Sequence, residues 1–196
     1  CHPSIANDNL SGAIVSMCLI NYFSKLKNLE KTIRFIFIPE TIGAIAYLSR
    51  NLVEMKENTV AGYVLTCVGD NRCYSYMPSR RGDSLADKAA LHCLNHKIES
   101  YEAYSFADRG SDERQYCSPG VDLPFASIMR TKYASYREYH TSLDNLKNVV
   151  TPDGLNGGFN IIKKAIEIIE RNCITKTKFL CEPHLSDNKY KDNSNY

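Results

Sequence analysis

The sequence predicts an α/β sandwich with a mostly parallel central sheet. Segments rich in β-branched and aromatic residues alternate along the chain with segments of helical periodicity, and this alternation is typical of a sheet covered by helices. With 196 residues, the chain is long enough for one domain with a sizeable buried core. We therefore expect one domain over residues 1–185, followed by a polar tail over residues 186–196.

The strand predictions rest on composition and on the residues that end each run. Residues 32–39 read TIRFIFIP, a β-branched and aromatic run that stops at proline, and they predict a buried strand. Residues 61–68 read AGYVLTCV and end at a Gly-Asp pair. Further strands are predicted at residues 100–106 and 123–129, with a polar loop over residues 109–120 between them.

Helices are predicted by apolar spacing and by capping residues. The expected ranges are residues 10–26, 41–55, 84–96 and 159–172, and residues 173–181 are expected to be extended. Asp8 or Asn9 is a natural N-cap for the first helix, and Asp83 or Ser84 for the third. In the first helix, Leu10 shares one side with Ile14, Met17 and Cys18.

Composition excludes several classes of protein. The net charge of +2 gives no reason to expect nucleic acid or an acidic membrane as partner. No apolar run approaches the roughly 20 residues that cross a bilayer, and no charged segment followed by an apolar core and a cleavage site points to secretion. None of the eight cysteines forms a Cys-x-x-Cys pair, so we expect reduced thiols in a cytoplasmic protein. Because the chain opens inside a motif and without Met, we interpret it as a fragment.

Polar residues follow the predicted strands, where the active sites of open α/β sheets gather. Glu40 and Asp70 each follow a strand, His2 and Asp8 precede the first helix, and His140 lies farther along. Imidazole and carboxylate groups are zinc ligands, and a free carboxylate can take a proton from water. The residues alone leave other roles open: Asp8 as a helix cap, Glu40 as a complement to the helix dipole, and His140 as a loop residue.

A resemblance to a known family covers nearly the whole chain. Residues 2–12, HPSIANDNLSG, resemble the metal loop of an aminopeptidase-like domain family encoded near bacterial polysaccharide biosynthesis genes. That family is similar to the zinc aminopeptidases and glutaminyl cyclases. Matching stretches follow in the expected order at residues 39–43, 110–116, 120–124, 139–145 and 181–185. The resemblance implies a zinc-exopeptidase-like, three-layer sandwich.

The resemblance assigns roles to residues of this chain. His2, Asp8 and His140 become metal ligands, and Glu40 becomes the catalytic general base. Asp8 would bridge two metals if a second were present. Tentative roles in binding substrate or a second metal fall to Asp70, Asp112, Glu113 and Arg114, where Arg114 could instead form a structural salt bridge.

One departure from the family limits the number of metals. The two-zinc aminopeptidases have adjacent acidic residues where this chain has Glu40 followed by Thr41. Only one of two roles, base or ligand, can then be filled there. The sequence therefore favours one zinc, or an altered second site, over the full two-metal arrangement.

The resulting prediction is a zinc-dependent hydrolase of amide bonds. We expect an aminopeptidase-like enzyme that removes an N-terminal residue from a peptide or aminoacyl compound, in a context linked to polysaccharide biosynthesis. One alternative is a non-peptidase amidohydrolase or acyltransferase that acts on a sugar derivative. A second is a non-catalytic metal-binding module. The sequence leaves the oligomeric state open.

Overall fold

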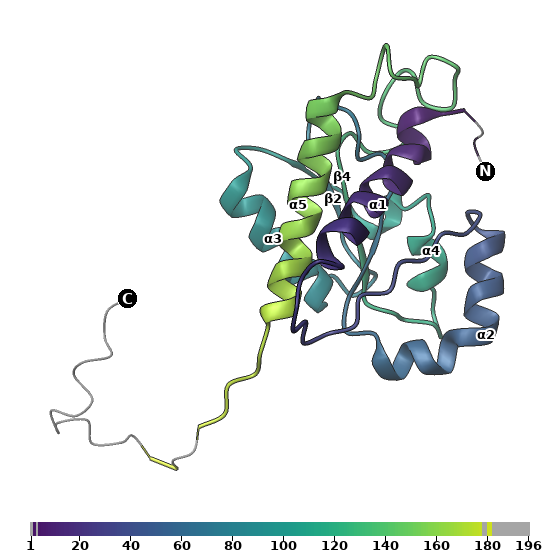
Figure 1. The fold of residues 1–196 in the computed structure, drawn as a ribbon. Helices are drawn as coiled ribbons and strands as arrows, with labels where there is room; N and C mark the ends of the chain where they lie inside the picture. The colour runs from purple at the N-terminus through teal and green to yellow at the C-terminus, as the bar shows by residue number, and fades with distance from the viewer. Residues whose placement is uncertain (1, 3, 178–179, 182–196) are drawn as a thin grey trace, which may run out of the picture.

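The computed structural model describes residues 2, 4–177 and 180–181. The predicted tail over residues 186–196 lies outside this range, as does most of the stretch over residues 181–185. The described helices are α1 (Ser11–Phe23), α2 (Ile42–Asn58), α3 (Leu85–Lys97), α4 (Glu113–Tyr116) and α5 (Pro152–Arg171). The described strands are β1 (Gly62–Val64), β2 (Ser75–Met77), β3 (Glu102–Ala103) and β4 (Phe125–Met129). Figure 1 shows their arrangement.

The strands form one sheet in the order β1-β4-β2-β3. β1 pairs with β4 and β2 with β3 in parallel, whereas β2 runs antiparallel to β4. The α/β class is thus confirmed, and the sheet is mixed although most of its pairings are parallel. β2 was not predicted, because its three residues are too short to show a periodicity.

The predicted strand at residues 32–39 is wrong. In the described chain this segment belongs to no sheet, and Phe37 is 54% exposed. Ile33 and Phe35 pack against one hydrophobic cluster and Ile38 against another. Side-chain packing therefore accounts for the apolar composition, but a strand also needs a neighbour for its backbone hydrogen bonds.

The strand predicted at residues 61–68 is shorter than expected for a related reason. Beyond β1 the backbone leaves the sheet and binds the N-terminal loop instead. The amide of Cys67 donates to the carbonyl of Asn7 at 3.1 Å, and the amide of Gly69 donates to Asn7 Oδ1 at 2.9 Å. The end of this segment thus anchors the loop that carries Asp8.

The four predicted helices are present with shifted bounds, and the predicted loop at residues 109–120 contains α4. α1 begins at Ser11 without a side-chain cap, so Asp8 and Asn9 do not have their expected role. Its buried side is formed by Val15, Leu19 and Phe23. The apolar residues that the sequence aligned lie on its other face, where Ile14 is 48% and Met17 is 60% exposed.

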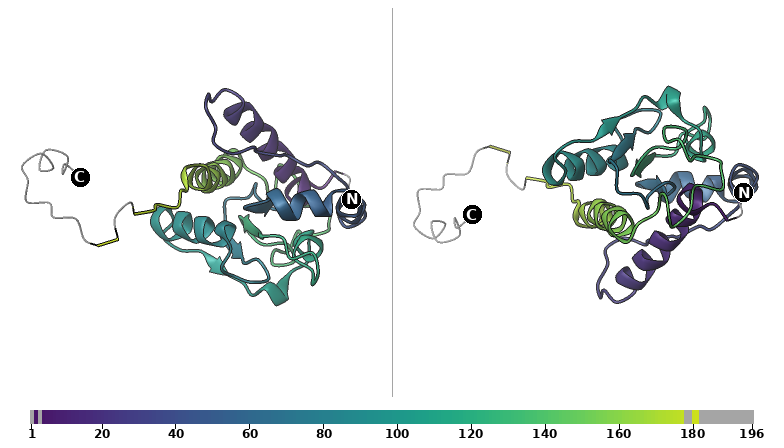
Figure 2. Two further views of the ribbon diagram at one scale, coloured as in Figure 1. Left: turned by 90° about the horizontal axis from the view of Figure 1, so that it is seen from below. Right: turned by 90° about the horizontal axis from the view of Figure 1, so that it is seen from above.

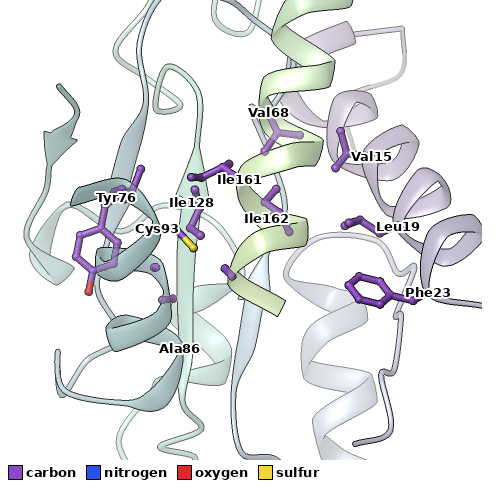
Figure 3. Packing of buried hydrophobic residues seen from close by; sticks show 14 residues of the cluster. Val15, Leu19, Phe23, Val68, Tyr76, Ala86, Cys93, Ile128, Ile161 and Ile162 are labelled. Atoms are coloured by element: carbon purple, nitrogen blue, oxygen red, sulfur yellow. The ribbon is translucent and has the colours of Figure 1, made fainter. Parts of the chain in front are cut away.

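The main hydrophobic cluster joins α1, α3 and α5 to the sheet. Figure 3 shows Val15 and Leu19 of α1 with Ile162 of α5 in this cluster, and α1 lies beside α5 in both views of Figure 2. In β4, Ala126 and Ile128 belong to this cluster, whereas Phe125 packs with α2 and α4. Because side chains alternate along a strand, helices cover both faces of β4.

Two glycines allow α1 and α5 to approach the segment after β1. A Cβ on Gly12 would lie 1.9 Å from the carbonyl oxygen of Leu65, and one on Gly158 would lie 2.3 Å from that of Val68. Any larger residue would force these helices away from the sheet. The approach fixes the start of α1, and with it the loop before α1.

Two further properties bear on the predicted class. The seven described cysteines are free thiols, and Cys18 is exposed rather than packed. Of the helices in the described residues, none combines the length and apolar character that a membrane span requires.

Asp87 anchors the start of α3. It is fully buried and accepts hydrogen bonds from Tyr76 Oη, from the amide and hydroxyl of Ser79, and from the amide and hydroxyl of Ser84. Burial alone would raise the pKa of this carboxyl, but the hydrogen bonds outweigh it and hold the pKa below its usual 3.8. The folded protein therefore favours the ionised form.

We predict that Asp87→Asn destabilises the fold by about 1–3 kcal/mol at neutral pH, because an amide nitrogen would face hydrogen-bond donors. A group whose pKa is lowered on folding stabilises above its unfolded pKa and loses this effect as pH falls through the folded value. The difference in unfolding free energy between wild type and variant should therefore shrink below about pH 4. Urea unfolding at pH 7, 4 and 3 measures it, and a difference that stays constant with pH would contradict the assignment.

Candidate metal centre

The N-terminal loop reaches the sheet through Asn7. This side chain is fully buried, accepts from the amide of Gly69, and donates through Nδ2 to Asp70 Oδ2 at 3.1 Å. The Asn7 carbonyl also accepts from Ser11 Oγ at 2.7 Å. These bonds place Asp8 beyond the carboxyl end of β1, where ligands bind in open α/β sheets.

A hydrogen bond to one of its two carboxylate oxygens orients Asp8. Oδ1 accepts a hydrogen bond from Thr66 Oγ1 at 3.1 Å. Oδ2 lies 3.1 Å from His140 Nε2 and 3.8 Å from His2 Nε2. The Thr66 bond therefore leaves the second oxygen facing both imidazoles.

The two histidines, which are 138 positions apart in the sequence, converge on Asp8. Their ring centroids are 4.3 Å apart, and the ring of His140 stacks on Tyr139 at 3.7 Å. Ligand atoms of His2, Asp8 and His140 all lie within 4.8 Å of one another. Figure 1 shows the start of the chain, the loops between β4 and α5 and the first turn of α2 at one end of the molecule.

This donor set fits zinc. Two imidazoles and one carboxylate are a ligand set of catalytic zinc sites, which keep a fourth position open for water or substrate. His140 is exposed at 45% of its side chain, so the group can be reached from solvent. The side chains that the sequence proposed as ligands therefore lie together in a suitable arrangement.

Glu40 lies beside this group without belonging to it. Its Oε2 is 3.8 Å from His2 Nε2, and its side chain is 19% exposed. The next residue, Thr41, has a φ of 61°, a left-handed conformation that is rare for a β-branched residue. The Thr41 amide donates to Asp112 Oδ1 at 2.7 Å, and Arg114 Nη2 donates to Thr41 Oγ1 at 3.3 Å. Asp112 and Arg114 thus support the corner that presents Glu40.

Burial disfavours the ionised forms of the acidic groups in this centre. Burial raises the pKa of Asp8, against the lowering effects of His2 and the Thr66 hydrogen bond. Burial also raises the pKa of Asp112, and the charge of Glu40 adds to this effect. Burial, helped by the charge of Asp8, raises the pKa of Tyr139 to about 12. A bound cation would offset the desolvation and repulsion that these groups experience.

Asp70 and Glu113 lie outside the group around Asp8. Asp70 is fully buried and accepts from the amide and hydroxyl of Thr131, at 2.9 and 2.6 Å, and from the amide of Arg72. Glu113 is also fully buried, and its Oε1 accepts from Tyr133 Oη and from the amide of Gly110. Both carboxylates hold loops together near the centre.

Sequence reasoning missed two supporting residues, Thr66 and Asp144. Asp144 is fully buried and accepts from the amides of Asn7 and Asp8, at 2.7 and 3.1 Å, and from Tyr136 Oη at 2.7 Å. A signal for Asp144 was present, since the Tyr-His-Thr-x-x-Asp stretch at residues 139–144 contains it. No local pattern distinguishes Thr66 from other strand residues.

Comparison with known proteins relates these features to a family. Residues 1–172 match a family described as a domain of unknown function (DUF4910). A Clostridium acetobutylicum protein, provisionally named a polysaccharide biosynthesis protein with an aminopeptidase-like domain, is 42% identical over 186 residues. The match covers 94% of this chain and 42% of that protein, so this chain spans less than half of its relative.

Solved structures have the same fold. A structure from Clostridium acetobutylicum, provisionally named a peptidase, matches with a TM-score of 0.85 and 41% identity, over 95% of this chain and 43% of that one. An aminopeptidase from Aneurinibacillus sp. strain AM-1 has a TM-score of 0.70 at 19% identity, over 83% and 39% of the two chains. A zinc aminopeptidase from Bacillus subtilis has a TM-score of 0.68 at 16% identity, over 84% and 42%. The last two show the fold alone, whereas the family match covers most of the chain: the protein belongs to the DUF4910 family.

Proposed function

We propose that this chain carries the zinc site of an aminopeptidase-like hydrolase, which removes an N-terminal residue from a peptide or aminoacyl compound. The observation that carries the proposal is the convergence of His2, Asp8 and His140, with the Glu40 carboxylate 3.8 Å from His2 Nε2. The names of the relatives and of the structural neighbours agree with it. The three-layer sandwich of the zinc exopeptidases is part of the same proposal.

The protein's own groups divide the work of amide hydrolysis. His2, Asp8 and His140 would hold the zinc, which would supply Lewis-acid chemistry by polarising a carbonyl and making water easier to ionise. Glu40 accepts the proton of the attacking water and delivers it to the leaving nitrogen. Its position near His2 but outside the ligand group suits this role better than that of a ligand.

The charge around Glu40 favours a substrate with a free amino terminus. Burial raises the pKa of Asp112, and the charge of Glu40 adds to this effect. A protonated amino group bound beside Glu40 would reduce the repulsion between these two groups. This preference distinguishes an aminopeptidase from an amidohydrolase that acts on uncharged amides.

We propose a single zinc. Asp70, the tentative ligand for a second metal, has hydrogen bonds to both of its carboxylate oxygens. Thr41 occupies the position where the two-zinc relatives have a second acidic residue. The three proposed ligands, His2, Asp8 and His140, then suffice for one ion.

A second candidate function is hydrolysis or transfer of an acyl group on a sugar derivative. The provisional name of the Clostridium acetobutylicum relative, which refers to polysaccharide biosynthesis, favours it. Aminoacyl-nitroanilides separate the two functions, because an enzyme that acts on acylated sugars should not cleave them.

Glu40→Gln should reduce kcat on an aminoacyl-nitroanilide by about 10²–10⁴, because general-base catalysis contributes this much. Zinc content measured by elemental analysis should stay unchanged. Glu57→Gln, at an exposed position near the end of α2, is the matched control and should retain full activity. Equal activity of the two variants would rule out Glu40 as the base.

His140→Ala should weaken zinc binding by more than about 100-fold, which is the upper range for loss of a residue that merely supports a ligand. His96→Ala is the control, because His96 is an exposed histidine of α3 whose ring nitrogen contacts the carbonyl of His92. Competition with a chromogenic chelator measures both affinities. A wild-type affinity in the His140→Ala variant would remove His140 from the ligand set.

A further inference from the structure

We propose that Asp144 is a positioning residue that fixes the orientation of Asp8 and thereby sets the zinc affinity of the centre. The inference rests on the proposed zinc site, and it adds a residue to which no ligand or catalytic role has been assigned. Asp144 is fully buried, so its carboxylate acts only on the groups that it contacts.

Asp144 binds three consecutive backbone amides of the metal loop. Its carbonyl accepts from Ala6 at 2.9 Å, Oδ1 accepts from Asn7 at 2.7 Å, and Oδ2 accepts from Asp8 at 3.1 Å. Hydrogen bonds from backbone amides to a carboxylate are short and strong. Together they fix the path of the chain at the residue whose side chain faces both histidines.

The same carboxylate is also connected to the segment that carries His140. Tyr136 Oη donates to Asp144 Oδ2 at 2.7 Å, and the Asp144 amide donates to the carbonyl of Thr141 at 3.1 Å. His140 lies between Tyr136 and Asp144 in sequence. Asp144 therefore joins the two segments that carry the proposed ligands Asp8 and His140. Asp8 itself is 136 residues away from Asp144 along the chain.

The carboxylate of Asp144 serves as the acceptor in each of its side-chain hydrogen bonds. The amides of Asn7 and Asp8 and the hydroxyl of Tyr136 all donate to the Asp144 carboxylate. An asparagine would point its own NH₂ group at one of these donors and lose at least one bond. Zinc requires ligand distances within about 0.2 Å of ideal, so a small displacement of Asp8 lowers affinity.

The test compares the zinc affinity of Asp144→Asn with that of wild type by chelator competition, and uses the visible spectrum of the Co²⁺-loaded protein to report ligand geometry. We expect a 10–100-fold weaker affinity, as is found for residues that orient metal ligands, and an altered Co²⁺ spectrum. An unchanged affinity and spectrum would overturn the inference.

Asp87→Asn is the matched control. Asp87 is equally buried and also accepts from backbone amides and a tyrosine hydroxyl, but its partners Tyr76, Ser79 and Ser84 lie outside the metal loop. Both variants should lower stability without metal, and only Asp144→Asn should lower zinc affinity. An equal loss of affinity in both would show that general destabilisation is the cause, and would overturn the inference.

If Asp144→Asn does not fold, Tyr136→Phe provides a second test of whether Asp144 sets the zinc affinity. It removes one donor to Asp144 Oδ2 and leaves the two amide bonds in place. We expect zinc affinity to fall several-fold, and an unchanged affinity would contradict the role of Asp144. The loss of turnover expected for Glu40→Gln tests the proposed function and does not depend on the zinc affinities of these variants. A wild-type protein that binds no zinc would instead refute the proposed function, and the positioning role with it.

Discussion

The buried hydrogen bonds of Asn7 determine where the candidate site forms. Its side chain joins the amide of Gly69 to the carboxylate of Asp70, and its carbonyl joins Cys67 to Ser11 at the start of α1. Because the segment after β1 uses its amides for these bonds, it leaves the sheet early. The fold thus exchanges regular strand pairing for a fixed loop, and Asp8 follows directly from that loop.

The sequence predicts helices better than strands here, for physical reasons. α5 has a periodicity, a capping Thr151 and a proline in its first turn, all of which are local. The segment at residues 32–39 has an equally clear composition, yet composition records only how apolar side chains pack. Whether a strand forms also depends on a neighbouring backbone, which no local pattern reveals.

The residues of the candidate site also differ in how far the sequence predicts them. His2, Asp8, Glu40 and His140 were predicted because their sequence stretches resemble motifs of a known family, and the structure brings them together. Thr66 and Asp144 act through hydrogen bonds across large sequence separations. Asp70 has a ligand-like position after a strand but is used to bind Thr131. Position at a strand end therefore identifies a region of the fold, and only the contacts identify the role.

Two residues with unfavourable backbone conformations lie at the candidate site. Thr41, next to Glu40, and His140 itself have positive φ values of 61° and 55°, each of which costs free energy in a residue other than glycine. Asp112 and Arg114 hold Thr41 in place, and Tyr139 stacks on His140. Such conformations persist only where surrounding contacts enforce them. The fold therefore stabilises an unfavourable backbone beside the proposed base and at a proposed ligand, both close to Asp8, whose pKa burial raises. This coincidence of backbone strain and a desolvated carboxyl group supports the proposal of a functional site here.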